Sequence, residues 1–72
     1  MQEYIERMID EYNELKERVD KLGIFLNGDI YKSLNLEEQN DLMMQYHAMV
    51  IYKIALDKRL RRRGIVKSQD RV

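Results

Sequence analysis

Residues 36–63 read LEEQNDLMMQYHAMVIYKIALDKRLRRR, and this stretch decides the fold. It contains no glycine or proline, and its apolar spacing predicts one long helix. Thirteen of the 19 positions from Leu42 to Leu60 are apolar, more than a helix with one neighbour needs. The apolar residues form two lines along the helix. The first line consists of Leu42, Tyr46, Met49, Leu56 and Leu60. The second line consists of Met44, Ala48, Ile51 and Ala55, with Val50 and Ile54 beside it. Because the rest of the chain is too short to cover both lines, the pattern favours self-association.

An unbroken heptad seam precedes this stretch. Apolar residues recur at alternating spacings of three and four, which is typical of a helix that packs along another helix. The seam consists of Ile5, Met8, Tyr12, Leu15, Val19, Leu22 and Leu26. It predicts a first helix over residues 2–26. Gly23 lies inside this helix at a cost of about 1 kcal/mol relative to alanine, which a close helix crossing would explain.

Four short signals divide the chain into elements. Asn27 and Gly28 end the first helix, because both residue types readily adopt the left-handed conformation at a helix C-terminus. Asp29 is then placed to cap a short helical turn, and Asn35 to cap the second helix over residues 36–63. Gly64 follows the last arginine and is a natural stop.

The short connection predicts an all-α, antiparallel two-helix hairpin with a short helical turn in the connection. A fold about residues 31–32 places position n near position 63 − n. The hairpin domain then covers residues 1–64, and residues 65–72 form a flexible tail. We expect copies of this hairpin to assemble into a homo-oligomeric helical bundle.

Charge is balanced overall but is unevenly distributed. Residues 1–20 carry seven acids and three bases, whereas residues 53–72 carry eight bases and two acids. In the antiparallel register these ends face each other, which places Glu3, Glu6, Asp10 and Glu11 alongside Lys58, Arg59, Arg61 and Arg62. The basic end can therefore neutralise the acidic end, or it can bind an anion.

Composition excludes several classes of protein. The 72 residues include no cysteine and one histidine, so disulfides, thiolate chemistry and a structural zinc site are excluded, and no cofactor is expected. Ser33 and Ser68 have no histidine near them in sequence, and no glycine-rich phosphate loop occurs, so we do not expect an enzyme. No apolar run is long enough to span a bilayer, and the acidic N-terminus does not resemble a signal peptide. We expect a soluble intracellular protein in which His47 has a structural or surface role.

Tyr4 and the arginine-rich segment 59–63 are the candidates for ligand binding. In the hairpin register Tyr4 falls near Arg59, and Arg7 lies one turn away. An aromatic ring beside two guanidinium groups is suited to a base and its phosphate. The alternative interpretation of segment 59–63 is a solvated helix end that complements the helix dipole and the opposing acids.

The spacing of these residues resembles a family of small phage and prophage proteins, the crAss-phage-related helical hairpins. The resemblance covers residues 4–60 and rests on Tyr4, Arg7, Glu11, Leu15, Arg18, Lys21, Leu22, Phe25, Leu34, Glu38, Leu42, Gln45, Met49, Tyr52, Leu56 and Arg59. That family is similar to the hairpin domain of anti-CBASS and anti-Thoeris sponges. The resemblance implies a compact homo-oligomer, often a hexamer, that sequesters cyclic di- or trinucleotides in the host bacterial cytoplasm without cleaving them.

The resemblance also implies roles for individual residues. Tyr4 would stack on a base, and the phosphates would be held by Arg7, Arg59, Arg62 and Arg63, with a neighbouring copy completing the site. Lys21 is a second, weaker candidate for phosphate contact.

Two other functions remain open from the residues alone. The hairpin is suited to binding and blocking a host protein through its exposed apolar line. It is also a candidate for weak nucleic-acid binding through Arg59–Arg63 and Lys67, although zero net charge argues against a stable DNA complex.

Overall fold

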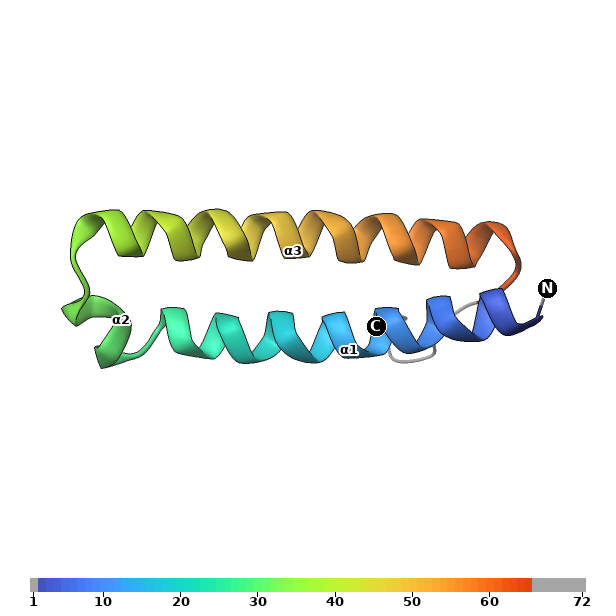
Figure 1. Cartoon of the computed structure of the whole chain (residues 1–72), viewed down its shortest axis with the longest axis horizontal. Coiled ribbons are helices and arrows are strands. Elements are labelled where there is room, and N and C mark those ends of the chain that lie inside the picture. The colour runs from blue at the N-terminus through green and yellow to red at the C-terminus, as the bar shows by residue number, and fades with distance from the viewer. Residues whose placement is uncertain (1, 66–72) are drawn as a thin grey trace.

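The computed structural model describes the backbone of residues 2–65 and the side chains of residues 3–65. It contains α1 (Gln2–Leu26), α2 (Asp29–Ser33) and α3 (Leu36–Arg62). The long helices α1 and α3 run antiparallel and pack together, and α2 lies at the closed end where the chain turns (Figure 1). The predicted all-α hairpin is confirmed, with α3 ending one residue before the predicted position.

The core lies between α1 and α3. Its buried side chains are Met8, Tyr12, Leu15, Val19, Leu56 and Leu60. The four from α1 belong to the predicted heptad seam, and the two from α3 belong to the first apolar line. Tyr46 and Met49 of that line are half-buried and pack against this core. Two helices alone bury few side chains, as expected for a chain of this size.

The second apolar line of α3 faces away from α1. Met44 and Ile51 are each 67% exposed, and Ala48 and Ala55 between them are exposed as well. The described part of the chain leaves this line uncovered, as the two-line pattern predicts. Its burial by other copies of the chain remains a prediction.

The end of α1 differs from the prediction in its backbone conformation. Neither Asn27 nor Gly28 has a positive φ, and Gly28 has a φ of −97° and a ψ of 174°. The left-handed conformation is not needed, because other groups bond to the last carbonyls of α1. The Asn27 side chain donates a 3.0 Å hydrogen bond to the Gly23 carbonyl. The backbone N–H groups of Asn27 and Gly28 donate to the carbonyls of Ile24 and Phe25, respectively. Gly28 is the N-cap of α2, so Asp29 is its first residue and not its cap.

Both ends of α3 have well-formed caps. The Asn35 side chain accepts a 2.8 Å hydrogen bond from the Glu38 N–H, which confirms the predicted cap. At the other end Gly64 has a φ of 83°, with 2.9 Å bonds from its N–H to the Arg61 carbonyl and from the Ile65 N–H to the Leu60 carbonyl. This pair of bonds is a Schellman motif.

The C-terminal cap also sets the position of Ile65. Ile65 is half-buried and packs against the core, because the Schellman motif turns the chain back over the end of α3. The flexible tail over residues 65–72 stays a prediction, and residues 66–72 lie outside the described part of the chain.

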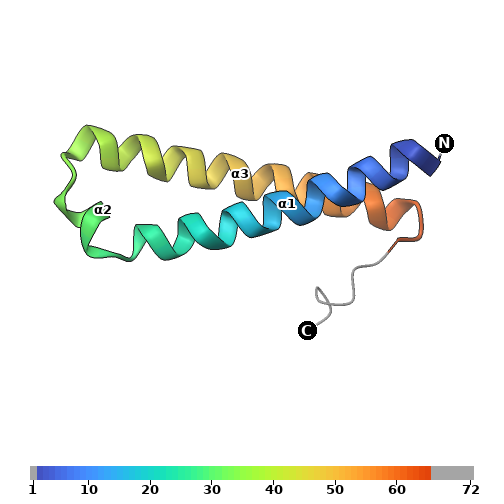
Figure 2. The same cartoon turned by 60° about the horizontal axis from the view of Figure 1, so that its bottom comes forward.

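Gln39 joins the connection to α3. Its side-chain amide donates hydrogen bonds of 3.0 and 3.1 Å to the carbonyls of Tyr31 and Leu34. The Tyr31 ring also packs edge-on against Phe25, with ring centroids 6.5 Å apart. These contacts fix α2 beneath the start of α3, as Figure 2 shows.

Candidate functional site

Two polar contacts link α1 and α3 in the half of the hairpin near the chain ends. Arg59 of α3 donates a hydrogen bond through Nη2 to the Tyr4 hydroxyl, and Tyr52 donates one to Oε2 of Glu11. Both pairs obey the predicted register, in which position n faces position 63 − n. The register is therefore confirmed in this half of the molecule.

Tyr4 lies beside two guanidinium groups. The central carbon of the Arg59 guanidinium is 5.9 Å from the centre of the Tyr4 ring, and that of Arg63 is 5.4 Å away. Arg63 is the C-cap of α3 and follows Arg59 by four residues, about one turn, which brings both to the same ring. Both distances fall within the range of cation–π attraction. Tyr4 remains 42% exposed, so part of its surface is accessible to a ligand.

A hollow of about 260 Å³ opens next to Tyr4. It is lined by Tyr4, Arg7, Met8 and Glu11 of α1 and by Arg59 of α3. The four residues of α1 follow the pattern i, i+3, i+4 and i+7 and so share one face of the helix. The structure thus brings together Tyr4, Arg7 and Arg59, as predicted from the sequence.

Glu11 is a lining residue that sequence reasoning assigned only to charge neutralisation. Its carboxylate accepts the Tyr52 hydrogen bond, and this bond is the main cause that raises the pKa of Tyr52. Partial burial of the phenol and the negative charge of Glu11 raise the pKa further, and Arg59 opposes them. The spacing of Glu11 seven residues after Tyr4 was the available signal, because it places both on one helix face.

The other predicted arginines occupy different positions. Arg62 is exposed and is not among the residues that line the Tyr4 hollow. Arg61 is held by Asp57, with 2.8 Å between Nε and Oδ2, and is thereby drawn away from the Tyr4 hollow. Of the arginines in segment 59–63, Arg59 and Arg63 are the two that contact Tyr4.

Lys21 lies far from the Tyr4 hollow within one chain. It forms an ion pair with Glu17, with 3.9 Å between Nζ and Oε2. Seventeen residues of α1 separate it from Tyr4, a rise of about 26 Å. The structure does not bring Lys21 into this site.

The charges across the hairpin are arranged differently from the prediction of opposed acids and bases. Ion pairs within α1 and α3 join residues four apart, as in Lys16–Asp20 at 3.7 Å and Asp57–Arg61 at 2.8 Å. The polar contacts between the helices at Tyr4 and Glu11 instead pair a tyrosine with a charged group. Among the described residues, neither Arg7 nor Arg59 forms an ion pair with an acid of the opposite helix.

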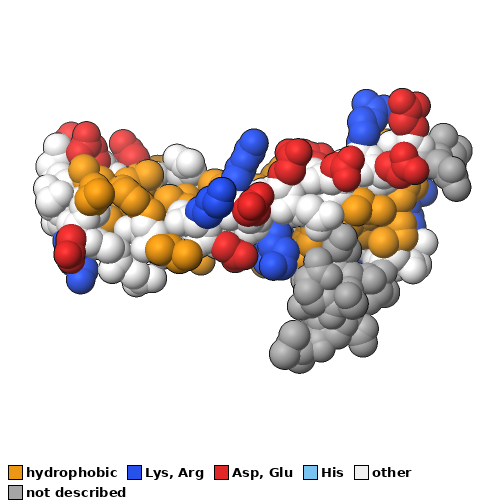
Figure 3. Space-filling model, turned by 90° about the horizontal axis from the view of Figure 1, so that it is seen from below, with side chains coloured by type: hydrophobic (Ala, Val, Ile, Leu, Met, Phe, Trp, Pro, Cys, Tyr) orange, Lys and Arg blue, Asp and Glu red, His pale blue; other side chains and the backbone are white. Residues whose placement is uncertain are grey.

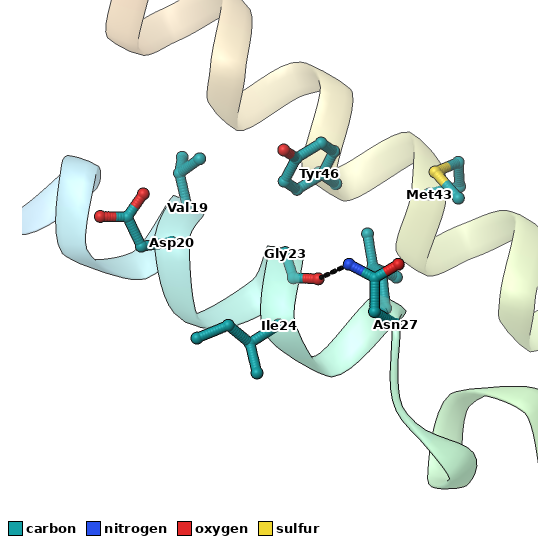
Figure 4. Close-up of a pocket in the computed structure, with 8 residues that line it drawn as sticks. Val19, Asp20, Gly23, Ile24, Asn27, Met43 and Tyr46 are labelled. Atoms are coloured by element: carbon teal, nitrogen blue, oxygen red, sulfur yellow. Dashed lines mark hydrogen bonds between the residues drawn. The ribbon is translucent and has the colours of Figure 1, made fainter.

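A second hollow, of about 440 Å³, lies near the closed end between α1 and α3 (Figure 4). Asp20 and the Tyr46 hydroxyl contribute polar groups to a mostly apolar lining, and none of its lining residues is a lysine or arginine. It is larger than the hollow at Tyr4, but it lacks the positive charge that phosphate binding requires. The candidate site for a nucleotide is therefore the smaller hollow at Tyr4, which carries the arginines.

The described residues show neither a metal site nor a membrane-spanning helix. No group of three or more histidine or acidic side chains is placed to hold a metal ion in this part of the chain. His47 is exposed on α3. Within the described helices, none combines the length and apolar character that crossing a bilayer requires.

Comparison with known proteins matches the chain to a protein family. The model of the Sequestin family matches residues 2–62, which include α1, α2 and α3. No curated protein and no solved structure matches the chain. The family name indicates a protein that sequesters a ligand, whereas the relation to crAss-phage hairpins remains a prediction. Because the match spans nearly all of the described residues, the chain belongs to the Sequestin family.

Proposed function

We propose that this protein is a phage-encoded, non-enzymatic sponge that sequesters a cyclic di- or trinucleotide immune signal of the host. The observation that carries the proposal is the grouping of Tyr4, Arg7 and Arg59 around one hollow, with Arg63 over the Tyr4 ring. Membership of a family named for sequestration supports it.

The chemistry of this group fits a nucleotide. The Tyr4 ring offers a stacking surface that accepts any base, and guanidinium groups match phosphate oxygens with paired N–H donors. Three arginines adjoin the hollow against the single carboxylate of Glu11, so the local charge is positive. Stacking and ion pairing hold a nucleotide without any group that would cleave it.

The size of the hollow indicates that one chain provides only part of the site. About 260 Å³ lies below the range of roughly 300–1,000 Å³ that is common for drug-sized ligands. A cyclic dinucleotide therefore needs a second copy of the chain to complete its enclosure. The exposed outer line of α3 (Met44, Ala48, Ile51 and Ala55) is the proposed contact between copies. A hexamer is the assembly that the resemblance to known sponges implies.

Lys21 and Arg62 are assigned to this assembly. Both are exposed, and neither lines the Tyr4 hollow of its own chain. In a homo-oligomer each would meet a ligand only from a neighbouring copy. We do not expect stable binding to DNA, because the chain has no net charge to drive it.

A double variant tests the proposed site. Tyr4→Ala combined with Arg59→Glu removes the stacking surface and reverses one phosphate contact, so we expect at least a hundredfold loss of affinity for a cyclic dinucleotide in calorimetry. Arg18→Glu is the matched control, because Arg18 is an exposed arginine of α1 outside the hollow. Sedimentation should show the same oligomer for all three proteins. Unchanged affinity in the double variant would remove this site from consideration.

A specific observation supports one other function. The exposed apolar line of α3 has the spacing of a helix that docks into a groove of another protein. A host-blocking protein would form a stable one-to-one complex with a single partner and would bind no nucleotide. A nucleotide-binding oligomer excludes this alternative, since the same line would be buried between copies.

A further inference from the structure

The hollow near the closed end has features of a small-molecule site that the nucleotide proposal does not use. Its volume of about 440 Å³ falls within the usual range for ligand pockets. Figure 4 shows the Tyr46 ring lying above Gly23, with Val19 and Asp20 on one side and Met43 on the other. Space-filling Figure 3 shows hydrophobic side chains at the surface of the closed end, and others toward the opposite end of the molecule. The lining is mostly apolar, with few polar groups, as in known ligand pockets.

Gly23 keeps the floor of this hollow open. A glycine inside a helix costs about 1 kcal/mol relative to alanine. The φ angle of Gly23 is not positive, so its backbone conformation does not require a glycine. An added Cβ would lie 3.6 Å from the Tyr46 ring, which is ordinary contact, so the predicted close helix crossing does not require it either. The absent side chain leaves only backbone atoms at this part of the lining, beside the Tyr46 ring.

Tyr46 reaches this position because of its direction on α3. The register places residue 23 opposite residue 40, but helix side chains tilt toward the N-terminus of their helix. The long Tyr46 side chain therefore extends toward the closed end and covers Gly23. Tyr46 is half-buried, and its hydroxyl oxygen would lie 3.7 Å from a Cβ added at Gly23.

The polar groups of the hollow include two hydrogen-bond acceptors, on Asp20 and Asn27. The Asp20 carboxylate is 63% exposed, and its ion pair with Lys16 spans 3.7 Å. The Asn27 amide donates to the Gly23 carbonyl at 3.0 Å, which leaves its side-chain oxygen as an acceptor. A complementary ligand brings N–H donors. It brings no phosphate, because the one charged lining residue is an acid.

We infer that this hollow binds a small, flat aromatic ligand that carries N–H donors and no phosphate, and a purine nucleoside is of this class. The Tyr46 ring would supply aromatic contact, the Gly23 floor would give space, and Asp20 would accept from an amino group. This inference does not depend on the proposed nucleotide site, because 19 residues of α1, a rise of about 28 Å, separate Gly23 from Tyr4.

Methyl NMR of the intact protein with adenosine tests the inference. We expect the Ile24 and Met43 methyl signals to shift and saturate on titration, because both residues line the hollow. Purine riboside, which lacks the amino group, should bind about tenfold more weakly because it loses one hydrogen bond to a carboxylate. AMP should bind no more tightly than adenosine, and an added cyclic dinucleotide should leave the adenosine shifts unchanged.

Variants of Gly23 separate binding from folding. Gly23→Ala should raise thermal stability while weakening adenosine binding, and Gly23→Leu should abolish binding by filling the floor. Absence of saturable shifts at millimolar adenosine, or full binding by a folded Gly23→Leu protein, would overturn the inference. Methyl shifts that follow protein concentration without ligand would also overturn it, because they would place a second copy of the chain in the hollow.

Discussion

Tyr52 and Glu11 form a contact between the helices whose strength depends on protonation. Their hydrogen bond is the largest of the causes that raise the pKa of Tyr52 above its ordinary value. Because the folded-state pKa is raised, the stabilisation is fully present below the ordinary tyrosine pKa. It is lost as the pH rises through the raised pKa. Glu11 is thereby tied to α3 at the edge of the arginine hollow.

The variant Glu11→Gln tests this contact. We expect the pKa of Tyr52 to fall toward the ordinary tyrosine range, because the charged acceptor is gone and Arg59 remains nearby. Ultraviolet titration of tyrosinate measures it, with Tyr52→Phe as the control that identifies the Tyr52 signal. An unaltered titration of Tyr52 in Glu11→Gln would show that the carboxylate does not control it.

Leu60 tests where the core lies. It is fully buried, so Leu60→Ala should lower the free energy of unfolding by about 2–5 kcal/mol through lost burial and the cavity left behind. Leu36→Ala is the matched control, because Leu36 is 70% exposed and its truncation should change stability by about 0.5 kcal/mol or less. Urea unfolding of the two variants at equal protein concentration gives the comparison. Equal losses would place Leu60 outside the core.

At the scale of the elements, the connection depends on one glutamine. Gln39 donates to the carbonyls of Tyr31 and Leu34, and it lies 3.3 Å from that of Lys32. Gln39→Ala should therefore destabilise the protein by about 1–2 kcal/mol, because those carbonyls lose their donor.

Gln45→Ala is the control for this prediction. It makes the same change on the same helix, but Gln45 has only a 3.9 Å contact with the Met49 sulfur. Amide hydrogen exchange should rise in α2 for Gln39→Ala alone. Equal exchange in the two variants would mean that Gln39 does not hold the connection.

The sequence predicted the helices well because each boundary has a local cause. The heptad seam from Ile5 to Leu26 and the Asn35 cap depend on neighbours within a turn or two, and both are seen in the structure. The end of α1 was predicted less well, since Asn27 satisfies the helix carbonyl with its side chain in place of a left-handed backbone. Propensity does not distinguish these two solutions.

Part of the candidate site was also predictable from the sequence. The antiparallel register follows from the short connection, and it places Tyr4 opposite Arg59 without further information. The Glu11–Tyr52 bond and the capture of Arg61 by Asp57 depend on how individual side chains turn. The role of Gln39 was missed because it bonds to carbonyls whose positions are set by α2.

At the scale of the whole molecule, the outer line of α3 is the proposed contact between copies of the chain. Ile51 is 67% exposed at the centre of this line. We expect Ile51→Glu to dissociate the oligomer, because a charge would be buried between copies at a cost of several kcal/mol. Light scattering after size-exclusion chromatography measures the mass. Asn13→Glu on the exposed face of α1 is the control, and we expect it to leave the oligomer intact. An unchanged mass for Ile51→Glu would place the interface elsewhere.

Assembly and binding are coupled in the proposed sponge. Since one chain offers a hollow of only about 260 Å³, dissociation should weaken nucleotide binding even though Tyr4 and Arg59 are intact. Conversely, the ligand should stabilise the oligomer, because it binds the assembled form more tightly.

Native mass spectrometry of the protein mixed with a panel of cyclic di- and trinucleotides is the most direct measurement of sequestration. The expected result is an oligomer that retains one class of ligand at fixed stoichiometry and releases it chemically intact on denaturation. An oligomer that retains none of the panel, or that returns a cleaved ligand, would contradict the sponge function.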